Sequence, residues 1–220
     1  LRSDWSSDVC SSDLVEREYC EILNSYSYAD EISKALFAVE TANMPLLGYG
    51  SKAFILSLLE NAIEISDGKL KAEEVKRILA LGKELLQLPG KPMKGVVETL
   101  KVLRELDKYH LVVFTKGELL DQENKFHRSG LAPYFEDIVV VSDKTEKSYH
   151  QLCERFSIGV GQLLMVGNSF RSDIEPVLKL GGWAAHIPFH TTWQHEVIEE
   201  YEHPHLLKLE FFTQLKDVLL

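Results

Sequence analysis

Hydrophobic and polar residues follow two different periods along this chain, and the change of period divides it into two parts. Between residues 15 and 88 apolar residues recur at helical spacing, as in Ile32, Leu36 and Val39, and no run has the pattern of a strand. We therefore predict an all-helical unit over residues 15–88. Its helices are expected at residues 15–24 and 29–41, from Ser51 onward, and at 69–88, with turns at Asn43-Met44-Pro45 and Gly48-Tyr49-Gly50.

After a Pro-Gly-Lys-Pro linker at residues 89–92, short apolar runs alternate with helical stretches. Strands are expected at residues 110–115, 137–141, 163–166, 183–187 and 205–211, and helices at 96–106, 119–129, 149–156, 174–180 and 213–219. Strands that alternate with helices are typical of a parallel sheet with right-handed crossovers. We therefore predict an α/β unit over residues 89–220.

The first fourteen residues have a different character from the rest. They repeat Ser-Ser-Asp without a helical or strand period, and they lack the basic start and apolar middle of a signal peptide. The stretch Asp8 to Leu14 resembles the translated read-through of a sequencing adapter. We expect residues 1–14 to be an artefactual or disordered tail, joined to a chain whose natural start is missing.

Composition narrows the class of protein. A net charge of −10 without a stripe of Lys and Arg argues against nucleic-acid binding, and no apolar run approaches the roughly 20 residues of a membrane span. The three cysteines are widely spaced and odd in number, which favours neither a disulfide framework nor a metal site. These features indicate a cytoplasmic globular protein.

Polar side chains follow three consecutive predicted strands. Thr115 ends the first strand, Lys144 follows the second, and Asn168 and Asp173 follow the third, after Gly167. Ligands of parallel sheets bind beyond the carboxyl ends of the strands. A hydroxyl and an ammonium group suit phosphoryl oxygens, and hard oxygen ligands suit Mg²⁺. Each residue alone also has an ordinary interpretation, as a cap or a surface charge.

From residue 15 to residue 220 the sequence resembles the haloacid dehalogenase-like hydrolases. In that family a strand ending in Ser or Thr, here Val112-Val113-Phe114-Thr115, binds the phosphoryl group. A lysine motif follows, which Ser142 to Tyr149 matches without its usual proline. The last motif is Val-Gly-Asp-Ser with another acid a turn later, matched by Met165 to Ser169 and Ser172-Asp173.

The resemblance implies a fold and a set of roles. The fold is a Rossmann-like parallel sheet (residues 89–220) with an inserted all-helical cap (residues 15–88). The cap should pack over the carboxyl ends of the strands, with Gly48 to Lys52 near the cleft. Thr115 and Lys144 are the implied catalytic residues, and Asp173 and Asn168 the implied Mg²⁺ ligands. The implied substrate-binding residues are Thr115, Lys116, Gly117, Lys144 and Ser169.

This chain departs from the family pattern at the catalytic nucleophile. The family's nucleophile is the first Asp of an Asp-x-Asp motif after the first strand, and no such motif occurs near the N-terminus. We expect the first strand and both of its carboxylates to be missing. Asn168 in place of Asp should weaken Mg²⁺ binding, because one negative charge is lost. Lys144 is preferred to Lys147 as the motif lysine, because it follows the strand directly.

Three functions remain open. The leading interpretation is a Mg²⁺-dependent phosphatase of a small phosphorylated metabolite, with no nucleic-acid or membrane partner. The alternatives are a metal-independent haloacid dehalogenase and a non-catalytic, ligand-binding family member. The cap residues Tyr49, Lys52 and Phe54 carry no recognisable substrate code, and the oligomeric state cannot be read from the sequence.

A histidine-rich stretch follows the last motif. The spacing of its histidines does not match a known metal-binding motif. We expect His186 to be buried on its strand. His190, Thr191 and Thr192 should line the mouth of the cleft.

Overall fold

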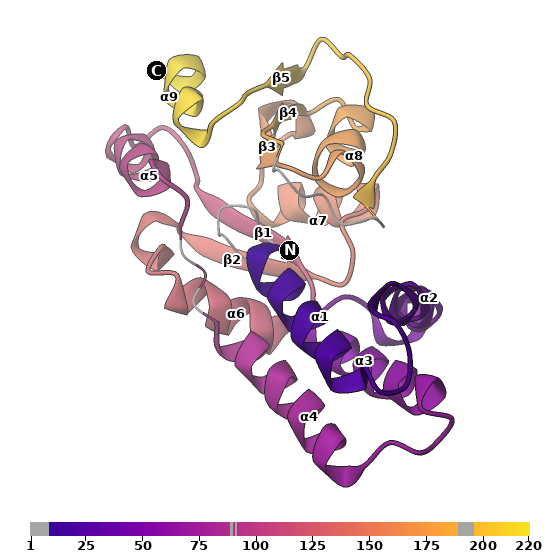
Figure 1. Ribbon diagram of the computed structural model, residues 1–220. Helices are drawn as coiled ribbons and strands as arrows, with labels where there is room; N and C mark the ends of the chain where they lie inside the picture. The colour runs from indigo at the N-terminus through magenta and orange to yellow at the C-terminus, as the bar shows by residue number, and fades with distance from the viewer. Residues whose placement is uncertain (1–8, 89, 91, 189–195) are drawn as a thin grey trace.

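The helical unit is a four-helix arrangement that lies on one side of the α/β unit (Figure 1). The structure is a computed structural model that describes residues 9–88, 90, 92–188 and 196–220, with side chains from residue 15 onward. The four helices are α1 (Val9–Leu23), α2 (Ala29–Leu47), α3 (Ser51–Ile65) and α4 (Ala72–Gln87).

The helices of this unit share one apolar core. Tyr19 and Leu23 of α1 pack with Ile32 of α2, Leu58 of α3 and Ile78 of α4, and all five side chains are fully buried. The core contains one polar network. The hydroxyl of Tyr19 donates to the carbonyl oxygen of Leu58 (2.8 Å) and accepts from the amide of Asn61 (2.8 Å).

Two boundaries in the helical unit differ from the prediction. Helix α1 begins at Val9 rather than at residue 15, so residues 9–14 are helical and not an irregular tail. Helix α2 continues through the predicted turn and contains Pro45. A proline removes one intrahelical hydrogen bond, and here that loss falls in the last turn, before Gly48 ends the helix with a positive φ of 70°.

The α/β unit follows the predicted order of strands and helices. Its elements are α5 (Val96–Glu105), β1 (Val112–Lys116), α6 (Leu119–Arg128), β2 (Asp137–Val141), α7 (Glu146–Arg155), β3 (Leu164–Gly167), α8 (Glu175–Lys179), β4 (Trp183–His186), β5 (Leu206–Lys208) and α9 (Leu215–Leu219). A π-helical turn, Phe170–Ile174, separates β3 from α8. All strand pairs are parallel, which confirms the predicted fold class.

The sheet is divided into two parts. Strand β1 pairs with β2, with Phe114 opposite Val139, and strands β3, β4 and β5 pair in that order, with Met165 opposite Ala184. Among the described residues no strand pairs with the second edge of β1 or with the second edge of β3. Figure 1 shows the two parts as separate groups of arrows.

Helices cover both faces of the sheet. Val113 on β1 packs with α5 and α6, whereas its neighbour Phe114 packs with α7, α8 and Met165 of β3. Successive side chains on a strand point to opposite faces, so α5 and α6 lie on one face and α7 and α8 on the other. Helix α9 contacts α5 and packs through Leu215 on Ala185 of β4. None of the described helices has both the length and the apolar character of a membrane span.

Replacing Tyr19 by Phe should destabilise the helical unit, because it leaves the buried carbonyl of Leu58 and the buried amide of Asn61 without their shared partner. The expected loss is about 1–3 kcal/mol in the free energy of unfolding, measured by urea denaturation. Tyr26→Phe is the matched control, because the hydroxyl of Tyr26 bonds to Glu74 at the surface (2.8 Å). Equal losses in the two variants would show that the Tyr19 network does not contribute.

Candidate functional site

The centre of the candidate site is a buried ion pair between the ends of two strands. Lys144 follows β2, Asp173 follows β3, and the Lys144 Nζ atom lies 2.5 Å from Asp173 Oδ1. The two side chains are 2% and 6% exposed. A charged group this deeply buried needs a partner of opposite charge, because water no longer solvates it. Lys147, the alternative motif lysine, lies on the exposed side of α7.

The loop after β3 is built to place Asp173. Its second carboxylate oxygen accepts the backbone N–H of Ser169 (3.1 Å), and the hydroxyl of Ser169 accepts the N–H of Ser172 (3.0 Å). The carboxylate also packs directly on Gly167, where a Cβ atom would lie 2.2 Å from Asp173 Oδ2. Glycine at the end of β3 is therefore required by the approach of the carboxylate, and not by the strand.

Thr115 lies at the end of β1, at the same edge of the sheet. Its side chain is 1% exposed, and its hydroxyl donates to the side-chain oxygen of Gln122 on α6 (2.9 Å). Gly117 has a φ of 138°, and its Cα faces the amide of the same glutamine. Gln122 thus holds the hydroxyl of Thr115 and lies beside Gly117, although the sequence analysis gave it no role.

Lys116 belongs to a second buried network, which the sequence analysis did not predict. Its ammonium group donates to the hydroxyl of Ser172 (2.8 Å) and forms an ion pair with Glu196. The carboxylate of Glu196 also accepts hydrogen bonds from the hydroxyls of Ser169 and Ser172. Burial raises the pKa of Glu196, but the ammonium group and the hydroxyls outweigh it and hold the pKa below its ordinary value.

The contact between Lys116 and Ser172 shows that the ends of β1 and β3 lie at one edge of the molecule. A shared site for Thr115 and Asp173 depends on this arrangement. The sequence analysis did not predict a role for Glu196, because the residues around it follow neither a helical nor a strand periodicity. The only indication in the sequence was an acidic residue in a polar segment after the last motif.

The loop between α2 and α3 reaches this edge, as the sequence predicted. The ring of Tyr49 lies over Lys116, with 4.0 Å between the ammonium nitrogen and the ring centroid. Ser51 donates to the carboxylate of Asp121 (2.8 Å), and Lys52 pairs with Glu118 (2.6 Å). Burial, and after it the negative charges of Asp143 and Glu196, raises the pKa of the Tyr49 hydroxyl. The helical unit therefore contacts the α/β unit beside the strand ends.

Asp173 and Asn168 suit a hard cation by their chemistry, because they offer a carboxylate and an amide oxygen. Both residues line the same end of one cavity. Within the described part of the chain, no three His, Cys, Asp or Glu side chains gather as a metal site. The donor chemistry of the two residues is compatible with Mg²⁺, and the two carboxylate oxygens of Asp173 accept from Lys144 and from the N–H of Ser169 in this structure.

The histidine-rich stretch is only partly described. His186 is buried on β4, as predicted, and its Nε2 atom lies 2.9 Å from the backbone oxygen of Asn168. His205 stacks on Trp183, with 4.3 Å between the ring centroids. His190, Thr191 and Thr192, which were expected at the mouth of the cleft, lie outside the described residues.

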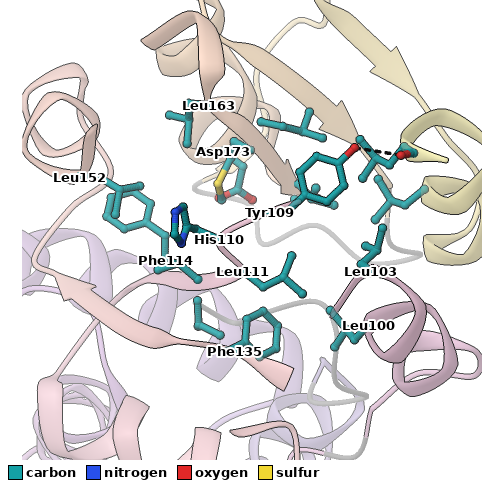
Figure 2. Close-up of a pocket in the computed structure, with 18 of the residues that line it drawn as sticks. Leu100, Leu103, Tyr109, His110, Leu111, Phe114, Phe135, Leu152, Leu163 and Asp173 are labelled. Carbon is teal, nitrogen blue, oxygen red and sulfur yellow. Dashed lines mark hydrogen bonds between the residues drawn. The ribbon is translucent and has the colours of Figure 1, made fainter. Parts of the chain in front are cut away.

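A cavity of about 420 Å³ extends from this edge between the two parts of the sheet (Figure 2). Lys144, Asn168 and Asp173 line it at the site, and Tyr109 and His110 line it near the start of β1. Figure 2 shows Leu100 and Leu103 of α5 on one side and Leu152 of α7 and Leu163 on the other. The candidate site is thus one end of a longer, mainly apolar space.

Comparison with known proteins identifies relatives of this chain. A family model described as haloacid dehalogenase-like hydrolase matches residues 13–181. A haloacid dehalogenase-like family hydrolase from Xanthomonas campestris is 31% identical, with a TM-score of 0.87 over 98% of this chain and 85% of that one. Among curated proteins, none is similar enough to count as a match.

Two more distant structures share the fold. A 2-haloacid dehalogenase from Pseudomonas syringae pv. Tomato is 16% identical, with a TM-score of 0.66 over 99% of this chain and 93% of that one. A predicted phosphoglycolate phosphatase from Haemophilus somnus is 17% identical, with a TM-score of 0.57 over 93% and 92%. At this level of identity the two structures support the fold and leave the reaction open.

Replacing Asp173 by Asn should destabilise the protein strongly, because it leaves the ammonium group of Lys144 buried without its counter-charge. Breaking a buried pair in this way costs about 3–5 kcal/mol, to be measured by urea unfolding. Glu175→Gln is the control, since it breaks the more exposed pair with Lys179 (3.0 Å) in the next helix and should cost about 0–1 kcal/mol. Similar losses in both variants would contradict the burial of the Lys144 pair.

The Lys116–Glu196 pair should make stability depend on pH. Because the pKa of Glu196 is lower in the folded protein, its contribution is complete above the ordinary Glu value of about 4.3 and is lost as pH falls through the folded value. Glu196→Gln should therefore flatten the acid side of the stability curve, measured as Tm from about pH 7 to about pH 3. The exposed Glu199→Gln is the control and should follow the wild type. Identical curves for Glu196→Gln and the wild type would contradict the ion pair.

Proposed function

The chain belongs to the haloacid dehalogenase-like hydrolase family, and we propose that its natural full-length form is a Mg²⁺-dependent phosphatase of a small phosphorylated metabolite. The observation that carries the proposal is the buried Lys144–Asp173 pair at the strand ends. Thr115 and Asn168 lie at the same edge, and so does the second buried network of Lys116, Ser172 and Glu196. We also propose a cytoplasmic location, supported by the buried free thiols of Cys20 and Cys153.

Each residue has a defined task in the proposed reaction. The ammonium group of Lys144 donates to phosphoryl oxygens and offsets their negative charge. The Thr115 hydroxyl, which donates to Gln122 in this structure, has to release that bond before it can donate to the same oxygens. Asp173 and Asn168 would hold Mg²⁺, and the ion would supply positive charge to the phosphoryl group.

The chemical step requires a nucleophile that the described residues do not contain. The family resemblance implies an aspartate on a strand that precedes the helical unit. Its carboxylate attacks phosphorus and displaces the alcohol, which takes a proton from the second Asp of the motif. Water then hydrolyses the aspartyl-phosphate to inorganic phosphate and restores the carboxylate. Lys144 cannot take this role, because its ammonium group is paired with Asp173 and carries no free electron pair.

A metal-independent dehalogenase is the second candidate, and one observation favours it. Asn168 is neutral, and the charge of Asp173 is offset by Lys144 at 2.5 Å. The site therefore holds a cation less strongly than two free carboxylates would. Such an enzyme forms an alkyl ester of the aspartate and releases halide. A non-catalytic member of the family would carry out neither reaction.

The test is to express the protein with its natural upstream sequence, beside the chain that starts at Leu1, and to assay both. We expect hydrolysis of p-nitrophenyl phosphate by the longer protein only, and loss of that activity with EDTA. Release of chloride from 2-chloropropionate without added metal would instead establish the dehalogenase. Turnover of the phosphate ester by the shorter chain would contradict the missing nucleophile, and inactivity of both proteins towards both substrates would favour the non-catalytic alternative.

In the active longer protein, Lys144→Ala should lower kcat/KM by about 2–4 kcal/mol of transition-state stabilisation, or roughly 30- to 1000-fold. The reason is that Lys144 is paired directly with Asp173, whereas Lys116, the other buried cation at this edge, is paired with Glu196. Lys147→Ala is the matched control, three positions along on the exposed side of α7, and should leave kcat/KM near the wild-type value. Equal losses in the two variants would show that Lys144 is not the motif lysine.

A further inference from the structure

Four buried polar side chains beside the candidate site have no task in the steps of the proposed reaction. The carboxylate of Glu196 accepts hydrogen bonds from the ammonium group of Lys116 and from the hydroxyls of Ser169 and Ser172. Each of the four residues is less than a tenth exposed. A carboxylate that has left water is stable only where donors of this kind surround it. The arrangement therefore has the chemistry of an oxyanion site, and a carboxylate of the chain itself fills it.

The three donors, Lys116, Ser169 and Ser172, are held by contacts that do not involve Glu196. Lys116 is the last residue of β1, and its ammonium group also donates to the hydroxyl of Ser172 (2.8 Å). The hydroxyl of Ser169 accepts the backbone N–H of Ser172 (3.0 Å) at the start of the π-helical turn. The site therefore keeps its donors in place when the carboxylate leaves.

Glu196 reaches the site from a segment without regular structure. It lies between β4 and β5, and residues 197–203 after it form neither helix nor strand. Its neighbour Val197 is 62% exposed. The segment is anchored further on, where the rings of Tyr201 and Phe170 pack with 5.1 Å between their centroids. Irregular segments open at a lower free energy than core strands, so Glu196 is the member of the network that is able to leave.

The site without Glu196 would attract an anion from solution. Departure of this carboxylate leaves the buried ammonium group of Lys116 with a weaker counter-charge. The carboxylate of Asp143 is 3.9 Å from the ammonium nitrogen and half-exposed, so water screens its charge. The ring of Tyr49 covers the same ammonium group at 4.0 Å and keeps water from it. A buried cation flanked by hydroxyl donors binds oxyanions more strongly than an exposed one does.

We propose that the three donors form a binding site for a free oxyanion, either a carboxylate or a phosphate, and that Glu196 fills this site as an internal competitor. The outside anion binds only while Glu196 is displaced. Its apparent affinity is therefore lowered by the fraction of time for which the site is free. The site is separate from the buried pair of Lys144 and Asp173, whose charged groups bond to each other.

One residue connects this site to the candidate active site. The hydroxyl of Ser169 donates to Glu196, and its backbone N–H donates to the carboxylate of Asp173 (3.1 Å). An oxyanion that replaces Glu196 is thus linked to Asp173 through Ser169 alone. The inference goes beyond the proposed function, and it requires no catalytic activity.

The test uses the whole chain and three variants. Glu196→Ala empties the site, and Glu196→Gln fills it with a neutral group of nearly the same size. The double variant Glu196→Ala/Lys116→Met also removes the cation. Sodium acetate and sodium phosphate are the two probes, and sodium chloride at equal ionic strength is the reference. Binding is measured as the rise in Tm and as shifts of the Ser169 and Ser172 amides in two-dimensional NMR spectra.

We expect saturable binding of an oxyanion to Glu196→Ala, with both serine amides shifted and Tm raised above its value in chloride. The wild type should bind the same anion at least tenfold more weakly, because a tethered carboxylate competes at a high effective concentration. Glu196→Gln and the double variant should show no saturable shifts. A response to acetate alone would identify a carboxylate site and a response to phosphate alone a phosphate site, and either result, or both together, supports the proposal.

Three results would overturn it. The first is the absence of saturable shifts in Glu196→Ala with both probes. The second is equal affinity in Glu196→Ala and the wild type, since Glu196 would then not compete. The third is binding that persists in the double variant, which would place the anion elsewhere.

The wild type alone decides the question if Glu196→Ala does not fold. Saturable shifts of the two serine amides at high acetate or phosphate concentration would then support the site, and unchanged shifts would overturn it. None of these measurements uses turnover, so failure of the proposed function leaves their outcome unaffected.

Discussion

The buried ion pair between Lys144 and Asp173 joins the two parts of the sheet. One partner follows β2 and the other follows β3, and no strand pairing connects these two strands in the described chain. A buried ammonium group and a buried carboxylate each lose their hydration, so each is stable only beside the other. The pair therefore fixes how the two parts approach at their carboxyl ends. The second pair, Lys116 with Glu196, strengthens the same junction.

The apolar core of the α/β unit is divided by the sheet itself. Val113 packs with α5 and α6 on one face, whereas Phe114 of β1 and Met165 of β3 pack together with α7 and α8 on the other. Ala185 and Leu215 form a further cluster beside α9. Successive side chains of a strand point to opposite faces, so separate clusters are expected where helices cover both faces.

The α/β unit could be read from sequence because apolar runs that end in polar residues are a local signal. Residues 137–141 form the strand that was predicted, and Leu119–Arg128 forms the helix, with α6 ending one residue early. The positions of Thr115 and Asp173 could be predicted because parallel strands bring their carboxyl ends together. The family and the fold class followed from the order of the same motifs. The contacts between these elements left no comparable local pattern in the sequence.

Three features could not be read from the local sequence pattern. Gln122 acquires its importance from Thr115 across a turn, and Glu196 from Lys116, eighty positions earlier. Pro45 was read as a turn from its own chemistry, but the last turn of a helix tolerates the missing donor.

A double-mutant cycle on Lys144 and Asp173, measured by urea unfolding, tests the central claim most directly. We expect Lys144→Met and Asp173→Asn together to cost less than the sum of the two single losses, with a coupling energy of about 1–3 kcal/mol. Additive losses would contradict the claim that the pair joins the two parts of the sheet.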